Sequence, residues 1–211
     1  MDISKITVNA QSSIMIDIGK KIYFDPYDID EATYDADYIF LTHDHYEHMS
    51  IPDIHKILNV ETTFVLPVAL ESLLRRSTTI GAIKRVIPGQ EYETNDFTFK
   101  TIPSYNITKP FHPKSAGYVG YVINIEGTTI YIPGDTDATK EAEEVKCDIA
   151  IVPVGGKFTM DYIEAAELVN KIKPKYAIPT HYGTIVGEKT DGDSFKKLVD
   201  KDIQVEIKLS F

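Results

Sequence analysis

Residues 38–48 read YIFLTHDHYEH, a short apolar run that ends in three histidines and two acidic residues. The apolar residues 38–41 predict a buried strand, and residues 43–48 predict the loop that leaves it. This loop carries three of the six histidines of the chain. Because histidine and carboxylate side chains together bind first-row transition metals, the loop predicts a metal site at the end of a strand.

The spacing of the side chains in this loop suits two ions. His43 and His45 alternate, so in an extended loop both side chains can face one ion, whereas the adjacent Glu47 and His48 can face a second. Two divalent ions about 3.5–4 Å apart form a hydrolytic site. A solvated, histidine-rich loop without a metal is the simpler alternative, and matches further along the chain argue against it.

The pattern His-x-His-x-acid-His after a strand and a threonine resembles the signature of the metallo-β-lactamase superfamily. The chain as a whole is most similar to the small UlaG-like metal-dependent hydrolases of that superfamily. The resemblance implies an α/β (α+β) protein with a four-layer αββα sandwich, in which two mixed β-sheets pack face to face with helices outside. A single domain would span residues 1–211, and the ligand loops would gather where strand ends from both sheets meet.

The composition restricts the class of partner. The chain has 211 residues, 43% hydrophobic content and a formal net charge of −10, with no cluster of lysine and arginine, which disfavours nucleic acid as a partner. No apolar run approaches the length of a membrane span, and no signal peptide is visible. Together with the single Cys147, these features predict a cytoplasmic protein that acts on a small molecule. They leave the oligomeric state open.

The ligands that the resemblance implies come from several segments. One ion would be held by His43, His45 and a third group, and the other by Glu47, His48 and His181. Asp135, after an apolar run and Pro133-Gly134, would lie between the ions, because a carboxylate has two oxygens and its charge offsets two dications. Glu47 stands where aspartate is usual, so its longer side chain either binds the ion or lies beyond ligand distance and acts as a base.

The third group of the first ion is ambiguous in the sequence. The superfamily usually supplies a histidine just after the strand at 97–102, but this chain has Asn106 there, and asparagine is a weak ligand for zinc-like ions. His112 follows six residues later. It replaces the missing ligand, lines the pocket as a substrate-binding or proton-transfer group, or is an ordinary loop histidine. Lys109, in the same loop, is solvated or meets an anionic substrate.

The chemistry that the resemblance implies is hydrolysis by a metal-bridging hydroxide. The bond would be an ester, lactone, amide or phosphodiester of a small molecule, with Glu47 or His112 as catalytic proton-transfer groups. Two divalent ions are expected, with Zn²⁺ favoured and Mn²⁺, Fe²⁺ and Ni²⁺ as alternatives. A metal-binding sensor or non-catalytic remnant of the same fold is the competing hypothesis, and Asn106 is the feature that favours it.

Patterns elsewhere predict the frame around these residues. Helices are expected at 51–58, 68–75, 139–145, 161–172 and 194–199, and a last strand at 203–209. Asp25, before Pro26, either supports the metal site or only forms a turn. Gly155 and Gly156 free this backbone for a close approach to another group, and the metal site is the expected one.

Overall fold

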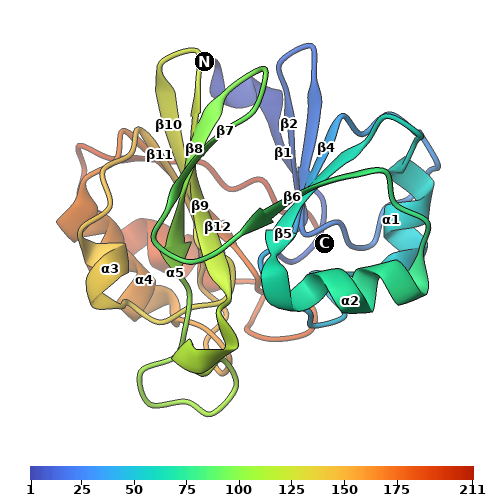
Figure 1. Ribbon diagram of the computed structural model, residues 1–211. Helices are drawn as coiled ribbons and strands as arrows, with labels where there is room; N and C mark the ends of the chain where they lie inside the picture. The colour runs from blue at the N-terminus through green and yellow to red at the C-terminus, as the bar shows by residue number, and fades with distance from the viewer.

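A computed structural model describes all residues from 1 to 211 as two β-sheets packed face to face (Figure 1). The first sheet has six strands in the order β1-β2-β3-β4-β5-β6. Their bounds are β1 Ile6–Val8, β2 Ile14–Asp17, β3 Lys21–Phe24, β4 Tyr38–Phe40, β5 Thr63–Pro67 and β6 Ala82–Val86. The sheet is mixed, because β1, β2 and β3 pair antiparallel whereas β3 to β6 pair parallel.

The second sheet has seven strands in the order β13-β12-β11-β10-β9-β8-β7. Their bounds are β7 Glu91–Glu93, β8 Thr98–Pro103, β9 Val119–Ile125, β10 Thr128–Ile132, β11 Ile149–Pro153, β12 Tyr176–Thr180 and β13 Gln204–Val205. Strands β7 to β10 pair antiparallel and β10 to β13 pair parallel. As a result β8, β10 and β12 run in the same direction and end at the same edge.

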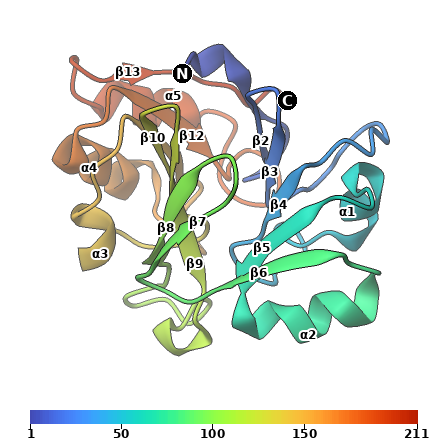
Figure 2. The same cartoon turned by 45° about the horizontal axis from the view of Figure 1, so that its top comes forward.

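Helices cover the outer face of each sheet (Figure 2). The first sheet carries α1 Ile51–Ile57 and α2 Val68–Ser77, and the second carries α3 Lys140–Glu143, α4 Tyr162–Ile172 and α5 Asp191–Leu198. Two short 3-10 helices are η1 Ile3–Lys5 and η2 Lys114–Ala116. This is the expected four-layer αββα sandwich, and the predicted fold class is confirmed. None of the helices combines the length and the apolar character that crossing a membrane requires.

Strand β4 is apolar on both faces because it lies between two hydrophobic clusters. Tyr38 and Phe40 belong to the large cluster between the sheets, whereas Ile39 belongs to the cluster beneath α1 and α2. Successive side chains of a strand point to opposite faces, so an uninterrupted apolar run is what a strand buried on both faces needs. Phe40 packs edge-on against Tyr121 of the second sheet, with ring centroids 5.0 Å apart. This packing fixes the end of β4, from which the histidine-rich loop departs.

Two predicted boundaries near the C-terminus are wrong. Helix α5 begins at Asp191 rather than 194, because Gly192 packs against the ring of Tyr182, where a Cβ would lie only 2.3 Å from its hydroxyl oxygen. The last strand has two residues instead of the predicted 203–209. The amide of Gln204 donates to the carbonyl of Lys175, just before β12, and that of Glu206 to the carbonyl of Ala177 within it. The next residue on that side of β12 is Pro179, which has no amide hydrogen to donate.

Candidate metal centre

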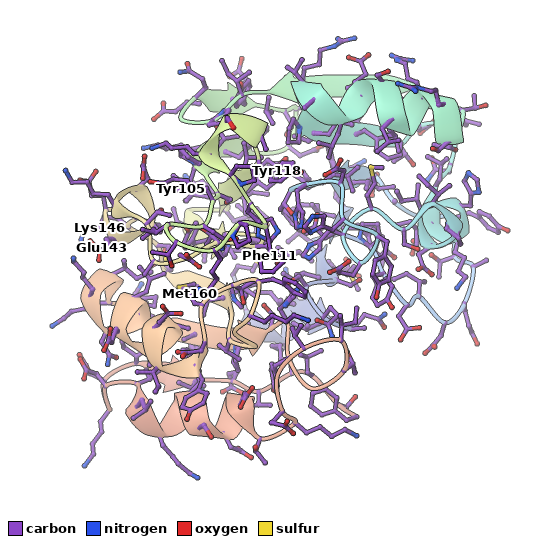
Figure 3. The ribbon with its side chains drawn as sticks, turned by 90° about the horizontal axis from the view of Figure 1, so that it is seen from below. Tyr105, Phe111, Tyr118, Glu143, Lys146 and Met160 are labelled. Atoms are coloured by element: carbon purple, nitrogen blue, oxygen red, sulfur yellow. The ribbon has the colours of Figure 1, made fainter.

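Four segments bring the candidate ligands together, and each leaves the carboxyl end of a strand. The segment 43–48 follows β4, the segment 104–112 follows β8, Asp135 follows β10 and His181 follows β12. The segment after β8 extends with η2 at the bottom of Figure 1. Viewed from this end, Phe111 and Tyr118 lie toward the middle, where the two halves of the molecule meet (Figure 3).

The loop after β4 contains a turn where an extended loop was predicted. The amide of His48 donates to the carbonyl of His45 at 2.9 Å, and this reverses the chain. The reversal separates the side chains into the two predicted sets. His43 and His45 join His112 and Asp135 in one group, whereas Glu47 and His48 join His181 in another. Within each group, the potential ligand atoms lie within 4.8 Å of one another.

Asp135 lies between the two groups, and each carboxylate oxygen faces one of them. Oδ1 is 3.2 Å from Nε2 of His48 and 3.4 Å from Nε2 of His181. Oδ2 is 3.6 Å from Nε2 of His112 and 4.0 Å from Nε2 of His43. All of these side chains are fully buried or nearly so. The position of Asp135 is therefore suited to a carboxylate shared by two ions.

The centre also contains buried polar atoms that lack a hydrogen-bond partner. These are Nε2 of His43, His48 and His181 and both carboxylate oxygens of Asp135. A buried polar atom without a partner costs about 1–3 kcal/mol, so a cluster of them on one spot calls for an additional binding partner. Imidazole nitrogens and a carboxylate are donors that zinc-type cations accept. The residues present therefore fit a metal centre.

Burial and charge shift the pKa values of these groups in opposite directions. Burial lowers the pKa of His43 well below its usual value and that of His112 to about 4. Burial also acts against the charged form of His48, but the carboxylates of Asp135 and Asp25 outweigh it and raise the pKa to about 10. Without an ion, a proton on His48 offsets the buried carboxylates, and cation binding would compete with that proton.

Asp25 contacts the candidate ligands from behind, so it does more than form a turn. Its carboxylate accepts from the amide and the hydroxyl of Thr42, at 2.8 and 2.6 Å, and lies 2.8 Å from Nδ1 of His48. The Thr42 hydroxyl is in turn 2.9 Å from Nδ1 of His43. One buried carboxylate thus orients two histidine rings, so that both Nε2 atoms point to the centre.

His112 reaches the first group, whereas Asn106 lies behind it. Nε2 of His112 is 3.3 Å from Nδ1 of His45. Oδ1 of Asn106 lies 3.0 Å from Nδ1 of His112 and accepts its backbone amide at 3.0 Å. The structure therefore brings His112, and not Asn106, together with His43, His45 and Asp135. Lys109 forms an ion pair with Asp137 at 2.7 Å.

Contacts that the sequence did not predict surround the candidate ligands. The backbone carbonyl of Gln11 accepts the amide of His181 at 3.0 Å, and His181 has a positive φ of 57°. The hydroxyl of Tyr118 donates to Asp44 at 2.7 Å, and its ring centroid is 5.3 Å from that of His43. No motif marked Gln11 or Tyr118, because their roles depend on contacts between distant segments. The remaining histidine, His55, is exposed and bonds to Thr78, as its position off the apolar stripe of α1 predicts.

Comparison with known proteins gives the same picture at the level of families. A family model described as the β-lactamase superfamily domain matches residues 5–181. A UPF0173 protein of Pyrococcus furiosus is 34% identical over 190 residues, which cover 88% of this chain and 85% of that protein. A UPF0173 metal-dependent hydrolase of Staphylococcus haemolyticus is 30% identical over 221 residues, which cover 95% of this chain and 96% of the relative.

The solved structures that resemble this chain share its fold over nearly the whole length. A protein of Parabacteroides distasonis that has been proposed to be a metal-dependent hydrolase aligns with a TM-score of 0.79 and 26% identity. The alignment covers 97% of this chain and 93% of that one.

Proposed function

The chain belongs to the metallo-β-lactamase superfamily and to its UPF0173 metal-dependent hydrolases, and from this premise we propose that it is a dinuclear, zinc-type hydrolase of a small molecule. The proposed bond is an ester, lactone, amide or phosphodiester. The observation that carries the proposal is the position of Asp135, whose two oxygens face two groups of mostly buried candidate ligands.

The proposed division of ligands follows the two groups. His43, His45 and His112 would hold one ion, Glu47, His48 and His181 the other, and Asp135 would contact both. Bound divalent ions supply a strong nucleophile from water at neutral pH and polarise the bond to be cleaved. The protein contributes rigid placement, since Asp25 and Thr42 hold the rings of His48 and His43 from behind.

Proton transfer is assigned to Glu47 rather than His112. Both ring nitrogens of His112 have neighbours, because Nδ1 faces Asn106 and Nε2 faces His45 and Asp135. His112 therefore has no free nitrogen for a proton on the substrate. Glu47 is nearly buried, and its carboxylate has one oxygen for the ion and a second that can accept a proton and return it to the leaving group.

Aromatic side chains beside the ligand histidines support a small organic substrate. Tyr46 follows His45, is 62% exposed and packs edge-on against Tyr27. Phe111 precedes His112 and is 40% exposed. The ring centroids of the two histidines are 4.8 Å apart, so each of these exposed aromatic residues adjoins, along the chain, one member of a pair of neighbouring histidines. Binding sites for small molecules are mostly apolar with a few convergent polar groups, and exposed aromatic residues next to candidate ligands could supply such apolar surface.

The competing hypothesis of a non-catalytic metal binder loses its specific support. It rested on Asn106, which left the first ion without a third histidine. Because His112 reaches that group from the same loop, the two groups offer a full set of ligands without Asn106 as one.

Elemental analysis combined with a substrate panel tests the proposal. We expect two ions per chain and metal-dependent hydrolysis within a panel of esters, lactones, amides and phosphodiesters. His48→Ala should abolish hydrolysis while the fold is retained, and His55→Ala is the matched control, because His55 is exposed and bonds only to Thr78. Absence of metal after Zn²⁺ is offered would refute the metal centre. Two ions without hydrolysis of any of the four bond classes would refute the proposed reaction.

A further inference from the structure

The side-chain amide of Asn106 has a single orientation that satisfies its neighbours. Its Nδ2 donates to Oδ1 of Asp137 at 2.9 Å and to the carbonyl oxygen of Phe158 at 2.8 Å. Both of these partners only accept hydrogen bonds, so both amide hydrogens are in use. The reversed amide would place an oxygen against a carboxylate and a carbonyl, which is repulsive. The amide oxygen must therefore face the other way, toward His112.

This orientation determines which nitrogen of His112 carries the proton. The amide oxygen of Asn106 accepts the backbone amide of His112 at 3.0 Å and lies 3.0 Å from its Nδ1. An amide oxygen cannot donate, so the hydrogen must lie on Nδ1. In the neutral ring, Nε2 then carries the lone pair, and this is the atom that faces His45 and Asp135. A metal ligand needs that lone pair.

The amide is itself held by a charged pair. Asp137 pairs with Nζ of Lys109 at 2.7 Å and accepts the backbone amide of Ile107 at 2.8 Å. Asp137 and Asn106 are both buried. The contacts therefore form a chain that begins at Lys109, near the surface of the loop. It continues through the carboxylate of Asp137 and the amide of Asn106 to the imidazole of His112.

We propose that Asn106 is a positioning residue that, anchored by Asp137 and Lys109, fixes His112 in its Nδ1–H form with Nε2 toward the first metal group. The inference rests on the proposed metal centre and adds a role to a residue that stands where a ligand was expected. An amide is required because it must accept from His112 and donate to Asp137. Aspartate would set two carboxylates against each other, and leucine would make neither bond.

The first test is nitrogen NMR of the full chain labelled at the histidine rings, recorded without metal and after Zn²⁺ loading. The signal of His112 is identified by its absence in His112→Gln. We expect the Nδ1–H form in both states of the wild type, although neutral imidazole otherwise prefers the Nε2–H form. The Nε2–H form in the metal-free wild type would overturn the proposal, since the amide would not be setting the tautomer.

The second test exchanges the two polar groups. Asn106→Asp should weaken binding of one of the two Zn²⁺ ions about 10–100-fold, as is typical when a partner behind a metal ligand is lost. In the double variant Asn106→Asp/Asp137→Asn, the new amide can again donate to the new carboxylate, but the carbonyl of Phe158 and the ammonium of Lys109 each lose a partner, so part of that affinity should return. Asn59→Leu is the control, because Asn59 bonds to the carbonyls of Tyr34 and Ala36 and should leave both ions bound.

The outcomes separate this inference from the proposed function. Unchanged Zn²⁺ affinity in Asn106→Asp overturns the positioning role and leaves the metal centre intact. The same holds if the losses of Zn²⁺ affinity in Asn106→Asp and Asp137→Asn simply add in the double variant. A wild type with two ions and the Nδ1–H form of His112, but without hydrolysis, supports the positioning role and refutes only the reaction.

Discussion

Adding one methyl group at Gly155 tests whether the second ligand group depends on the backbone position of His181. A Cβ at Gly155 would lie 2.1 Å from the carbonyl oxygen of His181, and real Cβ atoms essentially never come closer than 3.0 Å. The distance between the added Cβ and the carbonyl oxygen of His181 must therefore increase by at least 0.9 Å, from 2.1 to 3.0 Å. The φ of Gly155 is not positive, so the effect comes from space rather than from backbone conformation.

Such a displacement exceeds what a metal ligand tolerates, because ligand distances hold to within about 0.2 Å. We expect Gly155→Ala to lose the ion that Glu47, His48 and His181 are proposed to hold, which lowers the count by about one ion per chain. Overpacking of this kind costs about 1–3 kcal/mol of the free energy of unfolding. For a chain of this size each kcal/mol corresponds to about 2–4 °C in melting temperature, so the protein should remain folded at room temperature.

The assay is elemental analysis after dialysis against a fixed concentration of free Zn²⁺, with circular dichroism to verify the fold. Gly81→Ala is the control, because a Cβ there would lie 3.4 Å from the carbonyl oxygen of Val60, at the edge of ordinary contact. The control should retain both ions. Two ions bound by Gly155→Ala with the affinity of the wild type would refute the reasoning that the backbone at 155 sets the position of His181.

Three further predictions concern metal removal, a thiol and a salt bridge. Zn²⁺ at a free concentration 1,000 times its Kd should stabilise the fold by about 4 kcal/mol, so chelation should lower the melting temperature by about 8–16 °C, and an unchanged value would contradict a buried metal centre. Burial raises the pKa of Cys147 to about 12, so iodoacetamide at pH 7.5 should modify the folded protein far more slowly than the unfolded one; mass spectrometry detects this, and equal rates would contradict it. A hydrogen bond from Lys175, aided by Thr129, lowers the pKa of Asp148 to about 2, so its stabilisation is fully present above the unfolded-state pKa and is lost as the pH falls toward 2. Asp148→Asn should therefore lower the free energy of unfolding by about 1 kcal/mol at pH 7, after allowance for solvent screening, and by progressively less below pH 4. Urea unfolding measures this, and an equal loss at pH 7 and below pH 4 would contradict the linkage.

The sequence predicted the layers of the fold and the clustering of most candidate ligands because both follow from strands. Apolar runs such as residues 38–41 mark buried strands, and a polar side chain directly after such a run lies at the edge where the strands end. His43, Asp135 and His181 all occupy such positions. The boundaries near the C-terminus failed for a different reason, since the start of α5 depends on the packing of Gly192 against Tyr182.

The choice between Asn106 and His112 was beyond the sequence for a physical reason. Both residues lie in an irregular loop, where no periodicity fixes the direction of a side chain. Their directions come from Asp137 and Phe158, which are 31 and 52 residues away from Asn106 along the chain. Only the folded structure brings these partners together, so spacing alone left both alternatives open.

The glycines at 155 and 156 predicted a close contact but did not identify the group that makes it. The sequence predicted that something approaches this backbone closely, because glycine removes the side chain that would prevent it. The structure identifies the approaching group as the carbonyl of His181, the residue whose imidazole belongs to the second ligand group. His181 is held at its positive φ by the carbonyl of Gln11 on one side and by the space at Gly155 on the other. This strained conformation of His181 is compatible with a stable fold because Gln11 and Gly155 both restrict it. The conformation also places the imidazole of His181 against Asp135.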